Sequence, residues 1–238
     1  MRILFVVLLL LPCLPADLRS QSGARLPLIV LDAGHGGTDS GARNAEAGLT
    51  EKDAALSAAQ ALEKAFLQDR RLTVLLTRTG DIEMPLHARA EKANRARGQL
   101  LISIHTGFDT RADRAGARVY FLGPAHLPAA VSAKTVTGVK SPASLVPWAE
   151  AQVPFVNESN DLALLLQARL NTPFLSIHSV QSSPLLLLHF CAMPAVLVEL
   201  GNLADPADLT RLTSEEGRSQ WTPAVKSSVY EYLFGNTR

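Results

Sequence analysis

The chain has 238 residues, 47% of them hydrophobic, and its 23 basic and 22 acidic residues leave a formal net charge of +1. A chain of this length and composition can form one α/β domain with a full core. The even charge balance argues against nucleic acid as a partner, because a nucleic-acid groove needs an excess of basic residues.

Residues 1–24 have the pattern of a secretory signal peptide and a short linker. Arg2 supplies a positive charge, residues 3–11 are continuously apolar, and residues 12–16 offer small residues for cleavage. The apolar run is too short to cross a bilayer. We therefore expect an exported protein, in the periplasm, cell envelope or extracellular space, without a transmembrane segment in the mature chain. A lipoprotein acylated at Cys13 is the alternative.

Residues 28–32 form a short apolar run, LIVLD, which breaks sharply into the sequence AGHGG. Such a run, bounded by glycine, is typical of a strand buried on both faces, as in a parallel sheet covered by helices. His35 would then lie just beyond the carboxyl end of this strand. Open α/β sheets place their ligand sites at such strand ends.

Strands and helices alternate along the rest of the chain. Thr50 and Asp53 resemble a capping box at a helix start, and Gly98 is expected to cap the C-terminus of a later helix. The pattern predicts helices at residues 51–67, 85–97, 159–170, 206–212 and 223–234, and further strands at residues 72–77, 100–105, 117–122, 184–188 and 195–201. We expect a single α/β domain over residues 25–238, with a mostly parallel twisted sheet flanked by helices on both faces.

Ligand-type residues stand at the ends of these predicted elements. His35 and His105 each follow a buried strand, and Glu51 begins the first helix. Two imidazoles and one carboxylate, with a fourth position left for water, are the pattern of a catalytic zinc site. One interpretation is therefore a Zn2+ cofactor held by His35, Glu51 and His105. The other is that each histidine is an ordinary hydrogen-bonded loop residue.

Two glutamates are expected to have different roles. Glu51 lies at a helix N-terminus, where free N–H groups and the helix dipole favour the ionised form that binds metal. Glu199 lies among apolar residues at the end of a buried strand, where desolvation raises the pKa of a carboxyl group. A carboxylate with a raised pKa suits general acid–base catalysis. Alternatively, Glu199 is a buried carboxylate paired with an arginine such as Arg78 or Arg89.

Other motifs favour no rival chemistry. The loop of residues 34–37 allows a phosphate cradle, but it lacks the ending of a P-loop and the spacing of a dinucleotide site. The sequence contains no HExxH motif and no GxSxG nucleophile elbow. Cys191 has apolar neighbours and is expected to be a buried, inert thiol. No role is assigned to the other histidines, which are His87, His126, His178 and His189.

Five stretches of the sequence together resemble the zinc-dependent N-acetylmuramoyl-L-alanine amidase family, amidase type 3. They are VLDAGHGG at 30–37, GLTEKD at 48–53, LTR at 76–78, ISIH at 102–105 and MPAVLVELG at 193–201. The resemblance implies that His35, Glu51 and His105 are zinc ligands and that Glu199 is catalytic. It further implies peptidoglycan as the substrate, cleaved at the amide bond between N-acetylmuramic acid and L-alanine of the stem peptide.

Two departures from the family pattern lie next to the expected site. The second histidine is usually followed by Ala-Asn, and here Thr106 and Gly107 follow it. The ELG motif usually continues as Phe-Leu-Ser-Asn, and here residues 202–205 read NLAD. Neither departure removes a ligand, but both leave the substrate preference open.

Residues 123–157 are proline-rich and are expected to be an insertion outside the core. Some members of the family carry an inserted segment here that covers the zinc until an activator protein displaces it. Trp148 and Phe155 could anchor such a lid or line a glycan groove. An irregular surface connection is the alternative.

Two other functions remain compatible with the sequence. A non-catalytic peptidoglycan-binding or activator protein on the same fold would usually lack a ligand or the catalytic glutamate, and all four residues are present here. A zinc peptidase that cuts within the stem peptide would use the same chemistry. Its reaction products would distinguish it.

Overall fold

The computed structural model describes residues 25–111, 115–127, 150–171 and 177–235. The predicted signal peptide with Cys13, and Trp148 of the predicted insertion, lie outside these ranges. Across the described ranges, no helix has both the length and the apolar character needed to cross a lipid bilayer.

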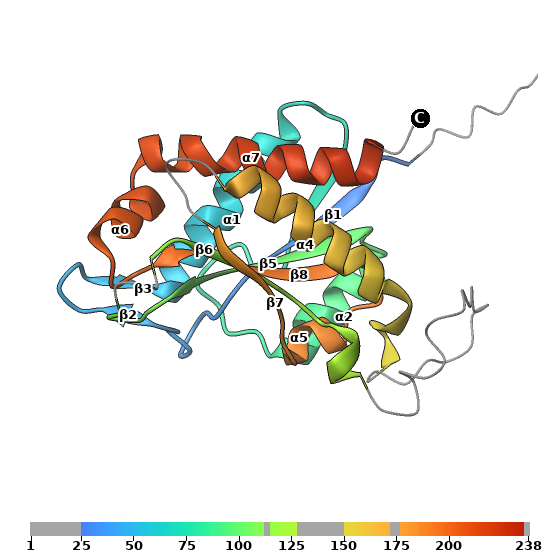
Figure 1. The fold of residues 1–238 in the computed structure, drawn as a ribbon, viewed down its shortest axis with the longest axis horizontal. Coiled ribbons are helices and arrows are strands. Elements are labelled where there is room, and N and C mark those ends of the chain that lie inside the picture. The colour runs from blue at the N-terminus through green and yellow to red at the C-terminus, as the bar shows by residue number, and fades with distance from the viewer. Residues whose placement is uncertain (1–24, 112–114, 128–149, 172–176, 236–238) are drawn as a thin grey trace, which may run out of the picture.

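A six-stranded sheet forms the centre of the domain (Figure 1). In spatial order its strands are β4 (Thr73–Leu76), β1 (Leu28–Ala33), β5 (Leu100–Gly107), β8 (Ala195–Asn202), β6 (Ala117–Phe121) and β7 (Ile177–Ser182). Neighbouring strands are parallel except for β6 and β8, which are antiparallel. The prediction of a mostly parallel sheet is confirmed. The carboxyl ends of β1, β5 and β8 share one edge, and β6 begins at that edge because its direction is reversed.

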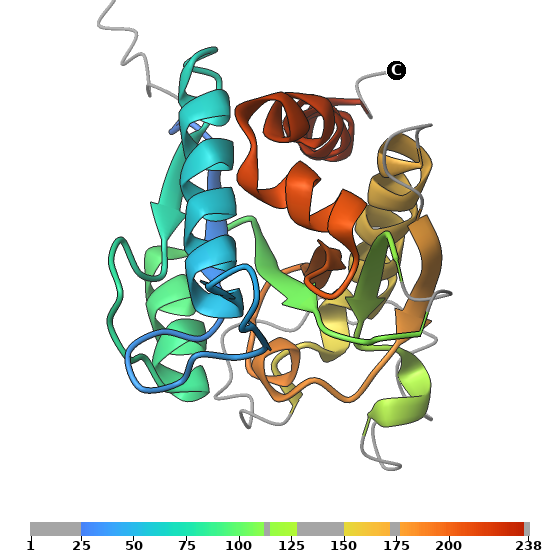
Figure 2. The ribbon, with the colours of Figure 1, turned by 90° about the vertical axis from the view of Figure 1, so that its left-hand side faces the viewer.

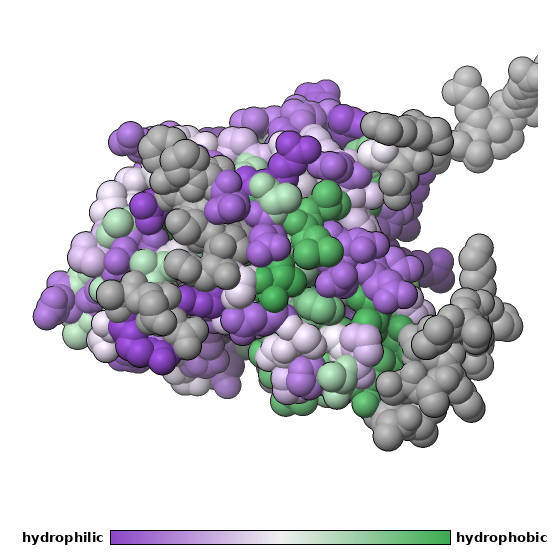
Figure 3. All heavy atoms as spheres, in the orientation of Figure 1, coloured by the Kyte–Doolittle hydropathy of each residue, from purple (hydrophilic) through white to green (hydrophobic). Residues whose placement is uncertain are grey.

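Helices cover both faces of the sheet, as predicted (Figures 1 and 2). The first face packs against α1 (Glu51–Leu67), α4 (Val156–Leu170), α6 (Pro206–Thr213) and α7 (Glu215–Phe234), and the second against α2 (Leu86–Ala96) and α5 (Leu186–His189). Side chains alternate between these cores, so that Ile29 and Leu31 enter the first and Val30 enters the second. Hydrophilic side chains cover most of the face seen in Figure 3.

A short hairpin precedes the first helix, in a stretch where no strand was predicted. Its strands are β2 (Arg43–Asn44) and β3 (Leu49–Thr50), which pair antiparallel. The Asn44 side chain donates a hydrogen bond to the carbonyl of Leu203, 2.7 Å away. Since β3 runs directly into α1, the hairpin fixes the position of the first helical residue.

Two helices begin earlier than predicted. α7 begins at Glu215, because Ser214 accepts a hydrogen bond from the Gly217 N–H and thereby caps the helix, and Pro223 lies inside it. α4 begins at Val156, within the predicted insertion. The residue expected to start it, Ser159, instead accepts hydrogen bonds from Gln152 and from the backbone N–H of Ala195.

The described ends of the predicted insertion contain single turns of 3-10 helix, η2 (Pro124–His126) and η4 (Val153–Phe155). The buried Gln152 side chain donates to Ser159 and to the carbonyl of Met193, so the second end is attached to the core. The lid interpretation stays a prediction, as do the domain boundaries.

The prediction between residues 177 and 188 was wrong. Residues 177–182, where no strand was predicted, form β7, which lies beside β6 at the edge of the described sheet. Its sequence, IHSVQS, has no long apolar run that would identify a buried strand. Residues 184–188, expected to be a strand, contain the start of α5. A short run of leucines cannot distinguish a buried strand from a buried helical turn.

Two caps also differ from the predictions. Thr50 precedes α1 as expected, but its hydroxyl donates to the Asp53 carboxylate and caps no backbone N–H group. Arg97, with φ of 57°, takes the left-handed cap position of α2 in place of Gly98. A Cβ on Gly98 would lie 2.6 Å from Val30, so glycine is required there by close packing.

Candidate functional site

His35 lies where β1 breaks, at the carboxyl edge of the sheet. Its backbone is left-handed, with φ of 58°, and it is followed by two glycines with positive φ. Its imidazole Nδ1 lies 2.8 Å from the Asp39 carboxylate, and its Nε2 lies 3.1 Å from Glu51 Oε2. The ring is therefore oriented at both nitrogens by carboxylates.

Glu51 is the first residue of α1 and is 6% exposed. Its carboxylate accepts hydrogen bonds from the backbone N–H groups of Ala42 and Thr106, at 2.9 and 3.1 Å. Its Oε1 lies 2.9 Å from His105 Nδ1. Burial opposes ionisation, but the hydrogen bonds from His105 and His35 outweigh it and hold the pKa of Glu51 well below its usual range.

His105 lies near the end of β5 and faces the same carboxylate. Two glycines make room for the cluster. A Cβ on Gly34 would lie 2.4 Å from the His105 ring, and a Cβ on Gly41, where φ is 60°, would lie 2.6 Å from both Glu51 and His35. A side chain at either position would displace a ligand-type group.

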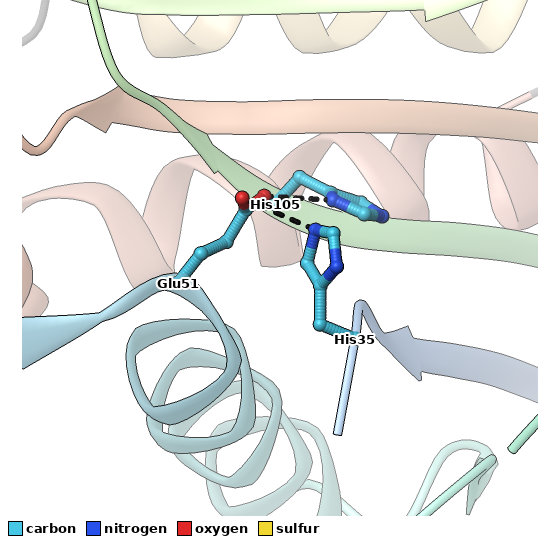
Figure 4. Close-up of side chains that lie close together, drawn as sticks. All are labelled: His35, Glu51 and His105. Atoms are coloured by element: carbon cyan, nitrogen blue, oxygen red, sulfur yellow. Dashed lines mark hydrogen bonds and ion pairs between the residues drawn. The ribbon is translucent and has the colours of Figure 1, made fainter. Parts of the chain in front are cut away.

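His35, Glu51 and His105 form one cluster (Figure 4). One ligand atom from each lies within 4.8 Å of the others, and the figure shows both imidazoles directed at the glutamate from separate elements. The hydrogen bond that His35 donates to the Glu51 carboxylate raises the pKa of His35. Two imidazole nitrogens and one carboxylate oxygen together form a set of ligand atoms suited to a divalent cation.

A buried network beneath His35 fixes the end of β1. Asp32 is 1% exposed and accepts hydrogen bonds from Thr77, Ser103 and Arg89 at 2.6, 2.7 and 2.9 Å. Burial of the carboxyl opposes ionisation, but the Arg89 guanidinium and the two hydroxyl groups outweigh it and lower the pKa of Asp32. Because these contacts compensate the buried charge of Asp32, we interpret this residue as a structural support of the site.

Arg78 and Arg89 bind the backbone around His35. Arg78 donates to the carbonyls of Ala33 and Gly34, at 2.9 and 2.7 Å. Arg89 donates to the carbonyls of Ala33 and His35. Neither arginine pairs with Glu199, whose ion-pair partner is instead Arg118, at 3.8 Å.

Glu199 lies beside the cluster, on the neighbouring strand β8, in register with His105. Its side chain is 24% exposed. Tyr120 donates a hydrogen bond to its Oε2 over 3.2 Å, and Arg118 Nη1 lies 3.8 Å from the same oxygen. Burial raises the pKa of Glu199, and the Tyr120 hydroxyl and Arg118 partly oppose this rise. Glu199 is therefore a partly buried carboxyl with a raised pKa, next to the ligand cluster.

Two clefts open on the site. One, of about 370 Å³, is lined by both histidines, Asp39 and the segment 83–86. The other, of about 250 Å³, is lined by Glu199, Arg118, Tyr120 and Asn202 among others. Cations and substrate groups therefore have access to both the ligand cluster and the acid.

The remaining sequence candidates lie elsewhere. Cys191 is fully buried, and burial raises the pKa of its thiol, as expected for an inert group. His87 is exposed on α2, and His189 ends α5 outside both clefts. His178 lies on β7.

Sequence reasoning missed Asp39, Arg118 and Tyr120. Asp39 follows His35 by four residues in a loop, where no periodic pattern identifies a partner. Arg118 and Tyr120 alternate along a predicted strand, which indicates a shared face but gives no neighbouring strand.

Comparison with known proteins identifies similar chains. A profile of the family described as N-acetylmuramoyl-L-alanine amidase matches residues 29–231. The N-acetylmuramoyl-L-alanine amidase AmiC of Neisseria meningitidis is 30% identical, with 92% of this chain and 55% of that protein covered. The amidase AmiA of Salmonella typhimurium is also 30% identical, with 87% and 76% covered. This chain thus spans about half the length of the meningococcal relative.

Among solved structures, the N-acetylmuramoyl-L-alanine amidase of Clostridium difficile 630 superposes with a TM-score of 0.71 at 21% identity. The match covers 90% of this chain and all of that one. At this identity the likeness supports the fold, and the sequence profile identifies the family.

Proposed function

The chain belongs to the N-acetylmuramoyl-L-alanine amidase family, and on this premise we propose that it is a Zn2+-dependent hydrolase of peptidoglycan. The bond cleaved is the amide between N-acetylmuramic acid and L-alanine of the stem peptide. The main support is the convergence of His35, Glu51 and His105, whose ligand atoms lie within 4.8 Å of one another, beside Glu199.

His35, Glu51 and His105 would hold the Zn2+. Asp39 accepts at His35 Nδ1, which leaves Nε2 for the metal, an arrangement common around metal-binding histidines. When bound, Zn2+ polarises the scissile carbonyl and lowers the pKa of a water molecule at the site.

Glu199 acts as the general base and then as the general acid. Its carboxylate takes the proton of the attacking water at Oε1 or Oε2 and delivers it to the alanine nitrogen as the amide bond breaks. A raised pKa suits this exchange, because it brings the free energies of the protonated and ionised forms closer together at neutral pH. The Tyr120 hydroxyl keeps the carboxylate oriented through its hydrogen bond.

Export to the periplasm, cell envelope or extracellular space follows from the substrate and from the signal-like residues 1–24. Peptidoglycan lies outside the cytoplasmic membrane, so the enzyme must reach it there. An activator protein as a partner depends on the lid interpretation of residues 123–157.

Product analysis tests the proposed reaction. Purified protein is incubated with purified peptidoglycan, with and without a chelator, and the released fragments are identified by mass spectrometry. We expect peptides that begin with L-alanine, no release in the chelator, and recovery on adding Zn2+. Peptides that begin at a later residue would indicate a stem-peptide peptidase. Absence of any fragment with Zn2+ present would favour the non-catalytic alternative.

A further inference from the structure

His105, Glu199 and Arg118 form a row across three neighbouring strands. His105 on β5 is in register with Glu199 on β8, which is in register with Arg118 on β6. Paired residues in a sheet point to the same face, and adjacent strands lie about 4.8 Å apart. Arg118 therefore lies one strand beyond the acid, on the side away from the metal ligands.

Arg118 is buried, but its guanidinium has no hydrogen-bond partner in the described parts of the chain. The residue is 5% exposed, and its closest recorded contact is Glu199 Oε2 at 3.8 Å, which is too long for a hydrogen bond. Arg78 and Arg89, equally buried, each bind several carbonyl oxygens. A largely buried guanidinium without protein acceptors is unfavourable unless water or a ligand in the adjoining cleft supplies them.

Arg118 lines the cleft of about 250 Å³. The other polar groups that line it are largely engaged. Asn202 binds the backbone of Asp109 at both its N–H and its carbonyl, and Arg111 forms a 2.6 Å ion pair with the Asp109 carboxylate. Asn202, Asp109 and Arg111 are thus held by contacts with one another, whereas the buried Arg118 has donors available to a ligand in the cleft.

We propose that Arg118 forms a subsite for a carboxylate of the stem peptide, next to the scissile bond. This inference rests on the proposed function. In the row, Glu199 lies between the metal ligand His105 and Arg118. Arg118 would therefore contact a part of the substrate on the far side of Glu199 from the metal-bound carbonyl. The muramoyl side of the bond offers hydroxyl and amide groups, whereas the peptide side carries carboxylates. A planar guanidinium suits a carboxylate, which it can bind through two hydrogen bonds.

The departures from the family pattern support this location. Gly107 and Asn202 stand where the family usually has asparagine and phenylalanine, and both line the same cleft. A glycine at 107 leaves space beside Glu199, whose Oε2 would lie 3.6 Å from an added Cβ. Two of the residues that depart from the family pattern therefore line the same cleft as Arg118.

Two synthetic muramoyl peptides test the subsite. They differ only in whether the residue after L-alanine carries a free α-carboxylate or a carboxamide. We expect the wild type to prefer the carboxylate roughly 10- to 100-fold in kcat/KM, as a charge-assisted contact supports. Arg118→Gln should abolish the preference through a raised KM, with kcat largely kept, and Arg118→Lys should restore part of it. Rates are compared at a pH well above the acidic limb, because Arg118 also affects the ionisation of Glu199.

Arg169→Gln is the matched control, because Arg169 binds Glu231 on the exposed surface away from both clefts. It should keep the preference. Equal use of both substrates by the wild type, or an equal fall in kcat on both with Arg118→Gln, would overturn the subsite.

Binding of the product dipeptides by calorimetry separates the two proposals. Tighter binding of the carboxylate dipeptide, lost in Arg118→Gln, supports the subsite even if neither substrate is hydrolysed and the amidase proposal fails. Equal binding of both dipeptides overturns the subsite even if hydrolysis is observed.

Discussion

The two sides of the site differ in how their polar groups are used. On the ligand side, Arg78 and Arg89 bind the backbone that carries His35, and the Glu51 carboxylate accepts from two backbone N–H groups as well as facing two imidazoles. On the acid side, Glu199 has one hydrogen bond, from Tyr120, among the interactions recorded for it.

The difference indicates a division of labour. The ligand side is preorganised by contacts within the protein, whereas the acid side keeps groups available for substrate and for proton transfer. Substitutions on the ligand side should therefore change metal content. Substitutions on the acid side should change turnover, pH dependence or substrate preference at constant metal content.

The largest effect is expected for His35→Ala. Loss of one of three ligands should remove the metal and reduce hydrolysis of peptidoglycan to background, since the metal activates both water and carbonyl. Elemental analysis and product release measure the two effects. His87→Ala, on the exposed face of α2, is the control and should retain metal. Full zinc occupancy in His35→Ala would contradict the ligand assignment.

Glu199→Gln should reduce turnover by roughly 10²- to 10⁴-fold, the usual contribution of a general acid–base group. Its zinc content should equal that of the wild type, because Glu199 lies outside the ligand cluster. Near-native turnover in this variant would remove Glu199 from the mechanism. Loss of zinc in Glu199→Gln would instead contradict the assignment of metal binding to the ligand side alone.

Asp39→Asn should weaken zinc binding by about tenfold, the lower end of the range for groups that orient a metal-binding histidine. The amide keeps the size of the side chain but removes the charge that faces His35 Nδ1. Competition with a chromophoric chelator measures the affinity. Asp69→Asn, where the carboxylate pairs with Lys226 away from the cluster, should bind zinc normally.

Tyr120→Phe should have the smallest effect, a shift of the acidic limb of the kcat/KM profile to higher pH. The hydroxyl stabilises the ionised form of Glu199, so its removal raises the pKa of that carboxyl further. The base then becomes ionised only at higher pH. An unchanged limb, or a shift to lower pH, would show that Glu199 does not control it.

Local patterns explain why the ligand side was predictable. His35 and His105 each end an apolar run, and Glu51 follows a recognisable helix start, so each position could be inferred from its own segment. The acid side depends on strand order. Ligand residues are expected at the carboxyl ends of strands, whereas Arg118 lies at the beginning of β6, which reaches the same edge because it is antiparallel to β8. β7 was missed because an edge strand buries too little apolar surface to show a clear pattern.

The register of β8 has a further consequence for this site. Because side chains alternate between faces, a shift of β8 by one residue would turn Glu199 into the core beneath α1 and α7 and bring Val198 or Leu200 between His105 and Arg118. Such a shift would also bury a carboxylate in that core, at a large cost in folding free energy. The pairing that aligns the reactive groups is thus the same pairing that a foldable chain must adopt, which makes correct assembly of the site a condition of folding.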